Sequence, residues 1–325
     1  MSTALPVGHG AGAAQEAPAL ALSIVTTLYR SRPYLDAFLA ASLEAIGSLG
    51  ITSYEILFVD DGSPDDSVVH LRQLKSSIPG LRIVELSRNF GHHHAMLAGL
   101  HCARGDRVFI ADSDMEVDPR VLVPFWEKLD EQPADVVYGY QETRKGGWVE
   151  RSGGHVFWRA FNLLSDTRVP EDLLTERLMT RRYVNALTSL GDTHLFLAGM
   201  MYWAGFVQVG MPVPKRQREG RSTYTLRKRV SLLARAITSF SAAPLYACGW
   251  IGFLALAVAS ANALFVIVRK LLHPASTLVG FPTMVAMFTG MFGLLMLGLG
   301  IVGVYVARIF VQTQGRPPFI IKNVD

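Results

Sequence analysis

Two aspartates one residue apart, Asp112 and Asp114, are the side chains whose type and spacing point most directly to chemistry. They follow a short apolar run, where the chain would turn out of a buried strand. Mg²⁺ and Mn²⁺ prefer oxygen ligands, and Mg²⁺ usually takes one or two carboxylates together with substrate phosphates. Glu116 is close enough in sequence to be a third ligand. We therefore expect a cation here that neutralises a departing diphosphate, although an acidic turn without a ligand is the alternative.

A second acidic pair, Asp60 and Asp61, is followed by Gly62 and Ser63. One carboxylate could accept hydrogen bonds from a base or a ribose, while Gly62 would let the backbone turn tightly. The alternative is an acidic turn that caps the next helix, with Ser63 as the N-cap residue. The residues alone do not separate these two interpretations.

Arg88 and a run of three histidines follow the third apolar segment. Arg88 could pair with a phosphate or with the acidic pair. His92, His93 and His94 invite a metal-binding interpretation. Consecutive residues of a helix point in different directions, however, so one ion cannot easily use all three. Packing at a helix start is the favoured interpretation.

Short β-branched runs alternate with helical segments from Leu22 onward, which predicts an α/β fold with a mostly parallel sheet. Ligands of such sheets bind at the carboxyl ends of the strands, where both acidic pairs fall. The nearly uncharged segment 195–213 is expected to be a buried strand or a membrane-facing loop. We expect strands at 22–28, 54–60, 82–87, 107–112 and 135–140, and helices at 33–47, 64–76, 92–103 and 119–131.

Two long apolar stretches near the C-terminus account for the mean hydropathy of +0.27. Residues 236–268 and 274–307 contain no Asp, Glu, Lys, Arg or His, and each exceeds the ~20 residues that cross a bilayer. Basic residues cluster before the first stretch and follow the second, so the positive-inside rule places both termini and the N-terminal domain in the cytoplasm. Because the net charge is only +4 and the basic cluster is next to the membrane, nucleic-acid binding is not expected.

These patterns divide the chain into segments. We expect a disordered tail over 1–20 and an α/β domain over 21–224. An amphipathic interfacial helix over 225–241 would lead into two transmembrane helices over 242–310, with a cytoplasmic tail over 311–325. Cys102 and Cys248 do not indicate a disulfide framework, which agrees with a reducing compartment.

The motifs together resemble those of the polyprenyl-phosphate glycosyltransferases, a branch of the inverting GT-A glycosyltransferases of family two. The resemblance covers about residues 20–310. It is carried by residues 59–63, 86–92, 105–106, 112–119, 177–179 and 220–224.

The resemblance implies transfer of a sugar, with inversion, from a nucleotide sugar, expected to be a UDP-sugar, to undecaprenyl or another polyprenyl phosphate at the cytoplasmic membrane. It implies a homo-oligomer only by analogy with relatives. The implied residues are Asp60, Asp61, Arg88 and Asp112 for the donor, Asp112, Asp114 and Glu116 for Mg²⁺ or Mn²⁺, and Arg218, Arg221 and Ser222 for the lipid phosphate.

One departure from the family pattern affects catalysis, for which Asp114 and Glu176 are the expected residues. Many relatives have an Asp, considered a catalytic base, where this chain has Thr175, followed by Glu176. Either Glu176 substitutes, or no base is needed because a phosphate monoester, with a second pKa near ~6, is already largely ionised at neutral pH.

Two other functions fit the same layout. A processive polysaccharide synthase would carry a Gln-x-x-Arg-Trp motif, which the sequence lacks. A non-catalytic membrane adaptor would not need both acidic pairs.

Overall fold

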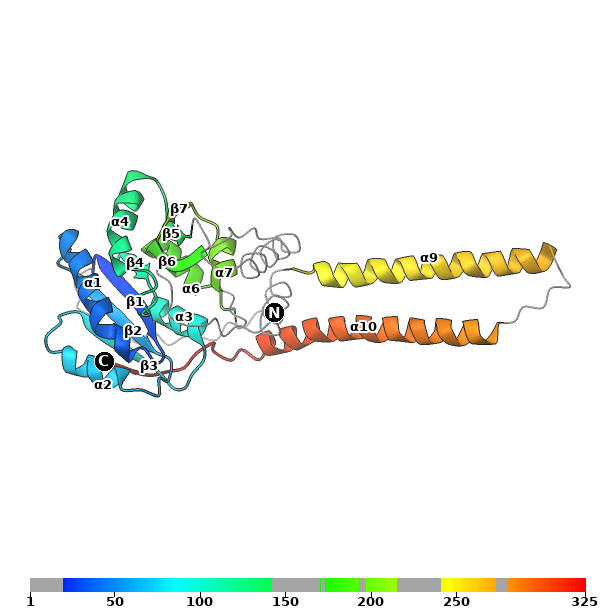
Figure 1. Ribbon diagram of the computed structural model, residues 1–325, viewed down its shortest axis with the longest axis horizontal. Coiled ribbons are helices and arrows are strands. Elements are labelled where there is room, and N and C mark those ends of the chain that lie inside the picture. The colour runs from blue at the N-terminus through cyan, green and yellow to red at the C-terminus, as the bar shows by residue number, and fades with distance from the viewer. Residues whose placement is uncertain (1–19, 142–169, 171–172, 193–196, 215–240, 273–279) are drawn as a thin grey trace, which may run out of the picture.

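The computed structural model describes residues 20–141, 170, 173–192, 197–214, 241–272 and 280–325. These residues form an α/β domain from which two long helices project (Figure 1). The tail expected over 1–20 and nearly all of the interfacial helix expected over 225–241 lie outside the described residues.

The described part of the domain is built on an eight-stranded sheet in the order β7-β5-β6-β4-β1-β2-β3-β8. Its central strands are parallel and rich in Val, Ile, Leu and Phe, as expected for strands that are covered on both faces. The predicted α/β fold with a mostly parallel sheet is therefore confirmed. These strands are β1 (Leu22–Leu28), β2 (Tyr54–Asp60), β3 (Leu81–Leu86) and β4 (Arg107–Ile110).

The remaining strands extend the sheet in ways that the sequence did not indicate. β6 (Leu173–Thr180) runs antiparallel between β4 and β5 (Val136–Tyr140). Because β6 contains polar residues, its sequence does not have the apolar pattern expected of a central strand. β7 (Gln208–Pro212) pairs parallel with β5, which confirms a strand in the second half of segment 195–213. Within the first half, the structure instead contains the helix α7 (Leu197–Trp203).

Helices cover both faces of the sheet (Figure 1). An apolar cluster around Phe38, Phe58, Phe109 and Phe125 joins one face to α1 (Leu35–Ser48) and α4 (Leu122–Glu131). A second cluster joins the other face to α3 (His92–Cys102), α6 (Arg181–Thr188) and α7. Its residues include Val25, Met96, Met179, Tyr183 and Met200. The remaining elements are α2 (Ser67–Leu74) and the 3₁₀ helices η1 (Arg32–Tyr34) and η2 (Pro119–Val121).

The prediction that Ser63 caps the second helix is wrong. α2 begins only at Ser67. The Ser63 hydroxyl donates to Asp65 Oδ1 at 2.6 Å and accepts from the backbone N–H of Arg30 at 2.8 Å. Because its hydroxyl is engaged by Asp65 and by the backbone of Arg30, Ser63 ties the acidic turn to the end of β1 and does not start a helix.

Two apolar helices, α9 (Ala243–Leu272) and α10 (Phe281–Thr313), run side by side away from the sheet (Figure 1). Each contains a stretch long and apolar enough to cross a membrane, Ala243–Arg269 and Gly290–Thr313. The Tyr305 hydroxyl donates to the backbone oxygen of Ser241 at 2.7 Å, which links α10 to the residues just before α9.

The segment after α10, expected only as a cytoplasmic tail, returns to the α/β domain. There β8 (Ile321–Val324) pairs antiparallel with β3 and forms the edge of the described sheet. The backbone N–H of Ser87 donates to the Ile320 oxygen, and Phe319 packs edge-on against His101. The two ends of the chain segment that holds α9 and α10 are thus both close to the α/β domain.

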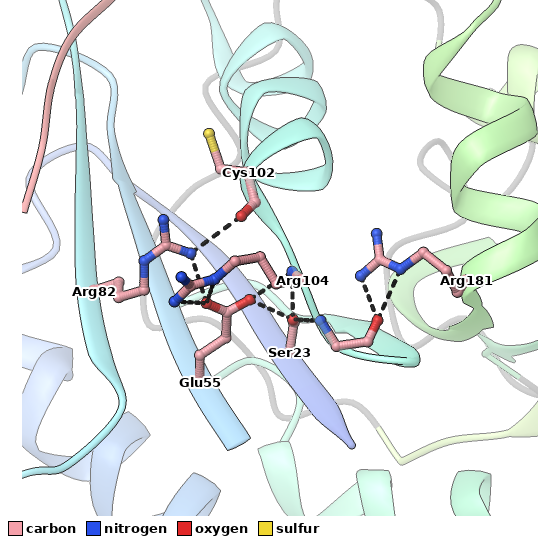
Figure 2. Close-up of polar contacts among 7 residues, drawn as sticks. Ser23, Glu55, Arg82, Cys102, Arg104 and Arg181 are labelled. Atoms are coloured by element: carbon pink, nitrogen blue, oxygen red, sulfur yellow. Dashed lines mark hydrogen bonds and ion pairs between the residues drawn. The ribbon is translucent and has the colours of Figure 1, made fainter. Parts of the chain in front are cut away.

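At the amino ends of the central strands, a buried carboxylate joins four segments of the chain (Figure 2). Glu55 is 1% exposed and accepts from Ser23 Oγ at 2.6 Å, Arg82 at 2.6 Å and the backbone N–H of Arg104 at 2.7 Å. Burial opposes ionisation of Glu55, but these donors outweigh it and lower the pKa of the carboxyl. The Glu55 cluster is at the amino ends of the strands, whereas the acidic pairs are at the carboxyl ends. We therefore assign the cluster a structural role.

Candidate active site

Both acidic pairs lie at the carboxyl edge of the sheet, as the sequence predicts. β2 and β4 both pair with β1, with Asp60 beside Leu28 and Ile110 beside Val25. Since all three strands are parallel, the residues that follow them emerge at one edge. The β1 strand separates the two acidic pairs there.

The Asp61 carboxylate holds the loop between β3 and α3. Its Oδ1 accepts from the backbone N–H of Phe90 at 2.7 Å, and its Oδ2 from that of Gly91 at 2.9 Å. The side chain is 3% exposed. Gly62 has a φ of +67°, and a Cβ there would lie 2.9 Å from the Asn89 nitrogen. The loop and the acidic turn are therefore in direct backbone contact.

Asp60 lies beside Asp61 and has a different environment. Its Oδ1 accepts from the backbone N–H of Ser63 at 2.9 Å. Burial raises the pKa of Asp60, and the nearby carboxylates of Glu85 and Asp61 add to this effect. Because ionisation of the buried Asp60 carboxyl is costly, a hydrogen-bond donor from a ligand, such as a ribose hydroxyl or a base N–H, would stabilise its charged form.

Arg88 is exposed on the loop that Asp61 holds. Its guanidinium lies over the Phe90 ring, 4.1 Å from the centroid, and donates to the Asn89 oxygen at 3.3 Å. Packing on an aromatic ring orients the guanidinium while leaving its edge in solvent. The side chain is thus placed where it could pair with a phosphate at the carboxyl edge.

The segment from Asp112 to Glu116 forms a tight turn fastened to β1. The Ser113 hydroxyl donates to the Thr27 oxygen at 2.9 Å. Met115 has a left-handed φ of +59°, and Asp114 Oδ1 accepts from the backbone N–H of Glu116 at 3.0 Å. A non-glycine residue in this conformation needs support from its surroundings, which the Asp114 contact provides.

The carboxylates of this turn fit a divalent cation in part. Among the described residues, no group of three His, Cys, Asp or Glu side chains lies close enough to hold a metal ion. Asp112 Oδ1 is buried and has no hydrogen-bond partner. A buried carboxylate oxygen without a donor is costly, and a cation would satisfy it. The arrangement suits Mg²⁺, which takes one or two carboxylates and completes its shell with phosphates and water.

His92 connects this turn to the loop held by Asp61. Its Nδ1 is 3.0 Å from Thr27 Oγ1, and its Nε2 is 3.4 Å from Asp112 Oδ1. The expectation that the histidines pack at a helix start holds for His92, which opens α3. Sequence reasoning did not find its contact with Asp112; the only signal was its place directly after Gly91 at the end of a strand–loop segment.

Glu176, the expected base, lies on β6 and is only 2% exposed. Its neighbours Leu174 and Leu178 pack in the cluster with α1 and α4, whereas Met179 packs with α3. Alternate residues of a strand share a face, so Glu176 points toward α1 and α4. His92 begins a helix on the other face. In the antiparallel pairing of β6 with β4, Arg177 lies opposite Ile110, the last residue of β4, so Glu176 is next to the carboxyl edge of the sheet. Its role as a base stays a prediction.

The basic stretch that contains Arg218, Arg221 and Ser222 lies outside the described residues. Their expected role at a lipid phosphate therefore stays a prediction.

A family model matches the part of the chain that holds this candidate site. The family model described as "Glycosyl transferase family 2" matches residues 23–193, which include both acidic pairs and β6. The chain belongs to this family and is a glycosyltransferase with a GT-A fold and two candidate membrane-spanning helices.

Relatives of this chain match most of its length, the apolar helices included. A protein from Mycobacterium tuberculosis, named as a glycosyltransferase, is 40% identical over 303 residues, covering 93% of this chain and 88% of the relative. The Bacillus subtilis glycosyltransferase YkcC is 30% identical over 273 residues, which cover 83% of this chain and 84% of YkcC. The bactoprenol glucosyl transferase of Shigella phage SfV is 29% identical over 271 residues, with coverages of 83% and 88%.

Proposed function

We propose that this glycosyltransferase transfers a sugar from a nucleotide sugar, with a UDP-sugar as the expected donor, to undecaprenyl or another polyprenyl phosphate. The similarity to a bactoprenol glucosyl transferase supports this acceptor, since it extends over 83% of the chain and therefore reaches into the apolar helices. The observation that carries the proposal is the position of both acidic pairs at one edge of a sheet that is joined to α9 and α10.

The donor would lie across the carboxyl edge. In this proposal Asp60 and the loop held by Asp61 would contact the nucleoside, and Arg88 would contact the diphosphate. Asp112 and Asp114 would hold Mg²⁺ or Mn²⁺, with donor phosphates and water completing its shell. The expected third ligand, Glu116, does not form a three-residue group with them in this structure. When bound, such a cation supplies charge that stabilises the leaving nucleoside diphosphate.

The acceptor phosphate oxygen would attack the anomeric carbon as the bond to the diphosphate breaks, which inverts the configuration. Since the phosphate is already largely ionised at neutral pH, the protein's main tasks are to position it and to stabilise the leaving group. Because the ionised phosphate needs no deprotonation before it attacks, we propose a mechanism without a protein base.

The membrane segments would hold the site at the depth of the lipid phosphate. In this proposal α9 and α10 cross the cytoplasmic membrane and the α/β domain faces the cytoplasm. Arg218, Arg221 and Ser222 would bind the lipid phosphate just before the first span. The product, a polyprenyl-phosphate sugar, would serve envelope glycan or lipid modification.

A transfer assay with the purified full-length protein, undecaprenyl phosphate, Mn²⁺ and a panel of nucleotide sugars tests the proposal. We expect nucleotide release together with a lipid product whose mass identifies the sugar. Asp114→Ala should reduce turnover at least about 10³-fold, and chelation of the cation should do the same. Nucleotide release without a lipid product would point to another acceptor and overturn the proposal.

A further inference from the structure

We propose that His92 is a positioning residue for Asp112, held in the required orientation by Thr27. The inference rests on the proposed function, in which Asp112 binds the donor and its cation. His92 would not touch substrate. It would act through the Asp112 carboxylate and thereby connect the loop beside the acidic pair on β2 to the acidic turn after β4.

The contacts of the two ring nitrogens orient the imidazole. A carboxylate only accepts hydrogen bonds, so a stabilising contact with Asp112 Oδ1 requires a proton on His92 Nε2. The other nitrogen, Nδ1, lies 3.0 Å from the hydroxyl of Thr27, which is only 8% exposed and can donate to the ring or accept from it. Thr27 therefore holds the ring in the orientation that turns Nε2 toward Asp112.

The backbone on both sides of the imidazole is fixed, although the side chain itself is about half exposed. Thr27 belongs to β1, which lies between the two acidic pairs, and its own backbone oxygen accepts from Ser113. Gly91, the residue before His92, is held by Asp61 through its N–H group. The contact with Thr27 therefore sets where the ring lies.

The distance between His92 Nε2 and Asp112 Oδ1 is 3.4 Å, longer than a hydrogen bond, and Asp112 Oδ1 has no hydrogen-bond partner. Contacts of this kind are often long in an enzyme without substrate and shorten in the complex. Groups that orient metal-binding side chains typically change metal affinity or activity by about 10–100-fold when removed. In this proposal His92 would orient the Asp112 carboxylate in the same way.

Mn²⁺ binding provides a readout that is separate from turnover. Free Mn²⁺ would be measured by electron paramagnetic resonance during titration of the full-length protein in detergent with UDP present. We expect His92→Ala to raise the Mn²⁺ concentration at half-saturation about tenfold or more and to lower kcat for sugar transfer. The KM for undecaprenyl phosphate should stay near the wild-type value if His92 acts only through Asp112.

Two conservative variants distinguish positioning from simple space filling. His92→Gln retains a donor at the distance of Nε2, and we expect it to recover most of the Mn²⁺ affinity. Thr27→Val keeps the shape of Thr27 but removes its hydroxyl, and it should weaken Mn²⁺ binding, whereas Thr27→Ser should not. His101→Gln, at the other end of α3, is the matched control. Thermal unfolding of each variant would confirm that it is folded.

Wild-type Mn²⁺ affinity and kcat in folded His92→Ala would overturn the inference. So would an equal loss in His92→Ala and His92→Gln, because that result would assign the effect to packing. Failure of the wild-type protein to transfer a sugar to any polyprenyl phosphate would refute the proposed function instead. The Mn²⁺ titration with UDP would still report on His92 in that case.

Discussion

Arg72 on α2 and Asp325 form an ion pair across the edge of the sheet, with 3.1 Å between Arg72 Nε and Asp325 Oδ2. The residues are 253 positions apart, and α9 and α10 lie between them in the sequence. The backbone N–H of Asp325 also donates to the Ile83 oxygen at 2.9 Å. The segment that follows α10 is therefore part of the α/β domain.

Deletion of residues 320–325 should loosen the edge of the sheet. Ser87, whose backbone N–H donates to the Ile320 oxygen, should exchange its amide hydrogen faster when that acceptor is removed. Hydrogen–deuterium exchange with mass spectrometry of peptides that cover β3 measures this. Asp325→Ala is the control, since a solvent-exposed ion pair contributes little to stability and the backbone pairing would persist. Unchanged exchange in the deletion variant would refute the assigned pairing.

Asp61→Asn should weaken donor binding without unfolding the protein. The carboxylate accepts two backbone N–H groups, from Phe90 and Gly91, but an amide presents only one acceptor oxygen. Hydrogen bonds to charged groups contribute about 1.5–3 kcal/mol, so we expect the KM for the nucleotide sugar to rise about tenfold. Steady-state kinetics with the donor varied would measure the change. A variant with wild-type donor KM would show that the loop does not depend on Asp61.

Glu55→Gln should destabilise the domain in a pH-dependent way. The folded-state pKa of Glu55 is lowered from 4.5, so its contribution is present above 4.5 and is lost as the pH falls through the lower folded-state value. We expect a loss of about 2–3 kcal/mol at neutral pH, because Arg82 and Arg104 lose a charged partner. The difference should shrink below pH 4.5. Thermal unfolding at several pH values would test this, and a difference independent of pH would contradict it.

Two helical glycines offer a matched test of packing. A Cβ at Gly99 on α3 would lie 2.4 Å from Val25 Cγ1 and 3.0 Å from Val59 Cγ2, whereas one at Gly47 on α1 would meet nothing within 4 Å. We expect Gly99→Ala to destabilise by about 1–3 kcal/mol through overpacking. Gly47→Ala should be neutral or stabilising by up to about 1 kcal/mol, since Ala favours a helix. Equal unfolding temperatures for the two variants would contradict the close approach of α3 to the sheet.

The sequence by itself determined the parts of this protein in which local pattern and local structure agree. The bounds of β1 and β2 were predicted correctly, because buried parallel strands are continuous β-branched and apolar runs between turn residues. The two apolar helices were evident for the same reason, since a long stretch without charge has few other stable environments. The position of both acidic pairs at the strand ends followed from the order of these elements.

Only the tertiary structure decided which strands are neighbours and what each acidic side chain contacts. β6 carries Glu176 and Arg177 in its middle, so its place between β4 and β5 depends on packing that no local pattern reveals. β8 forms by pairing with a strand about 240 residues earlier, and its short, partly polar sequence gives no signal alone. The contact between His92 and Asp112 arises because β1 brings α3 and the end of β4 together. Such relationships depend on contacts that are remote in sequence, and hydrophobic periodicity does not encode them.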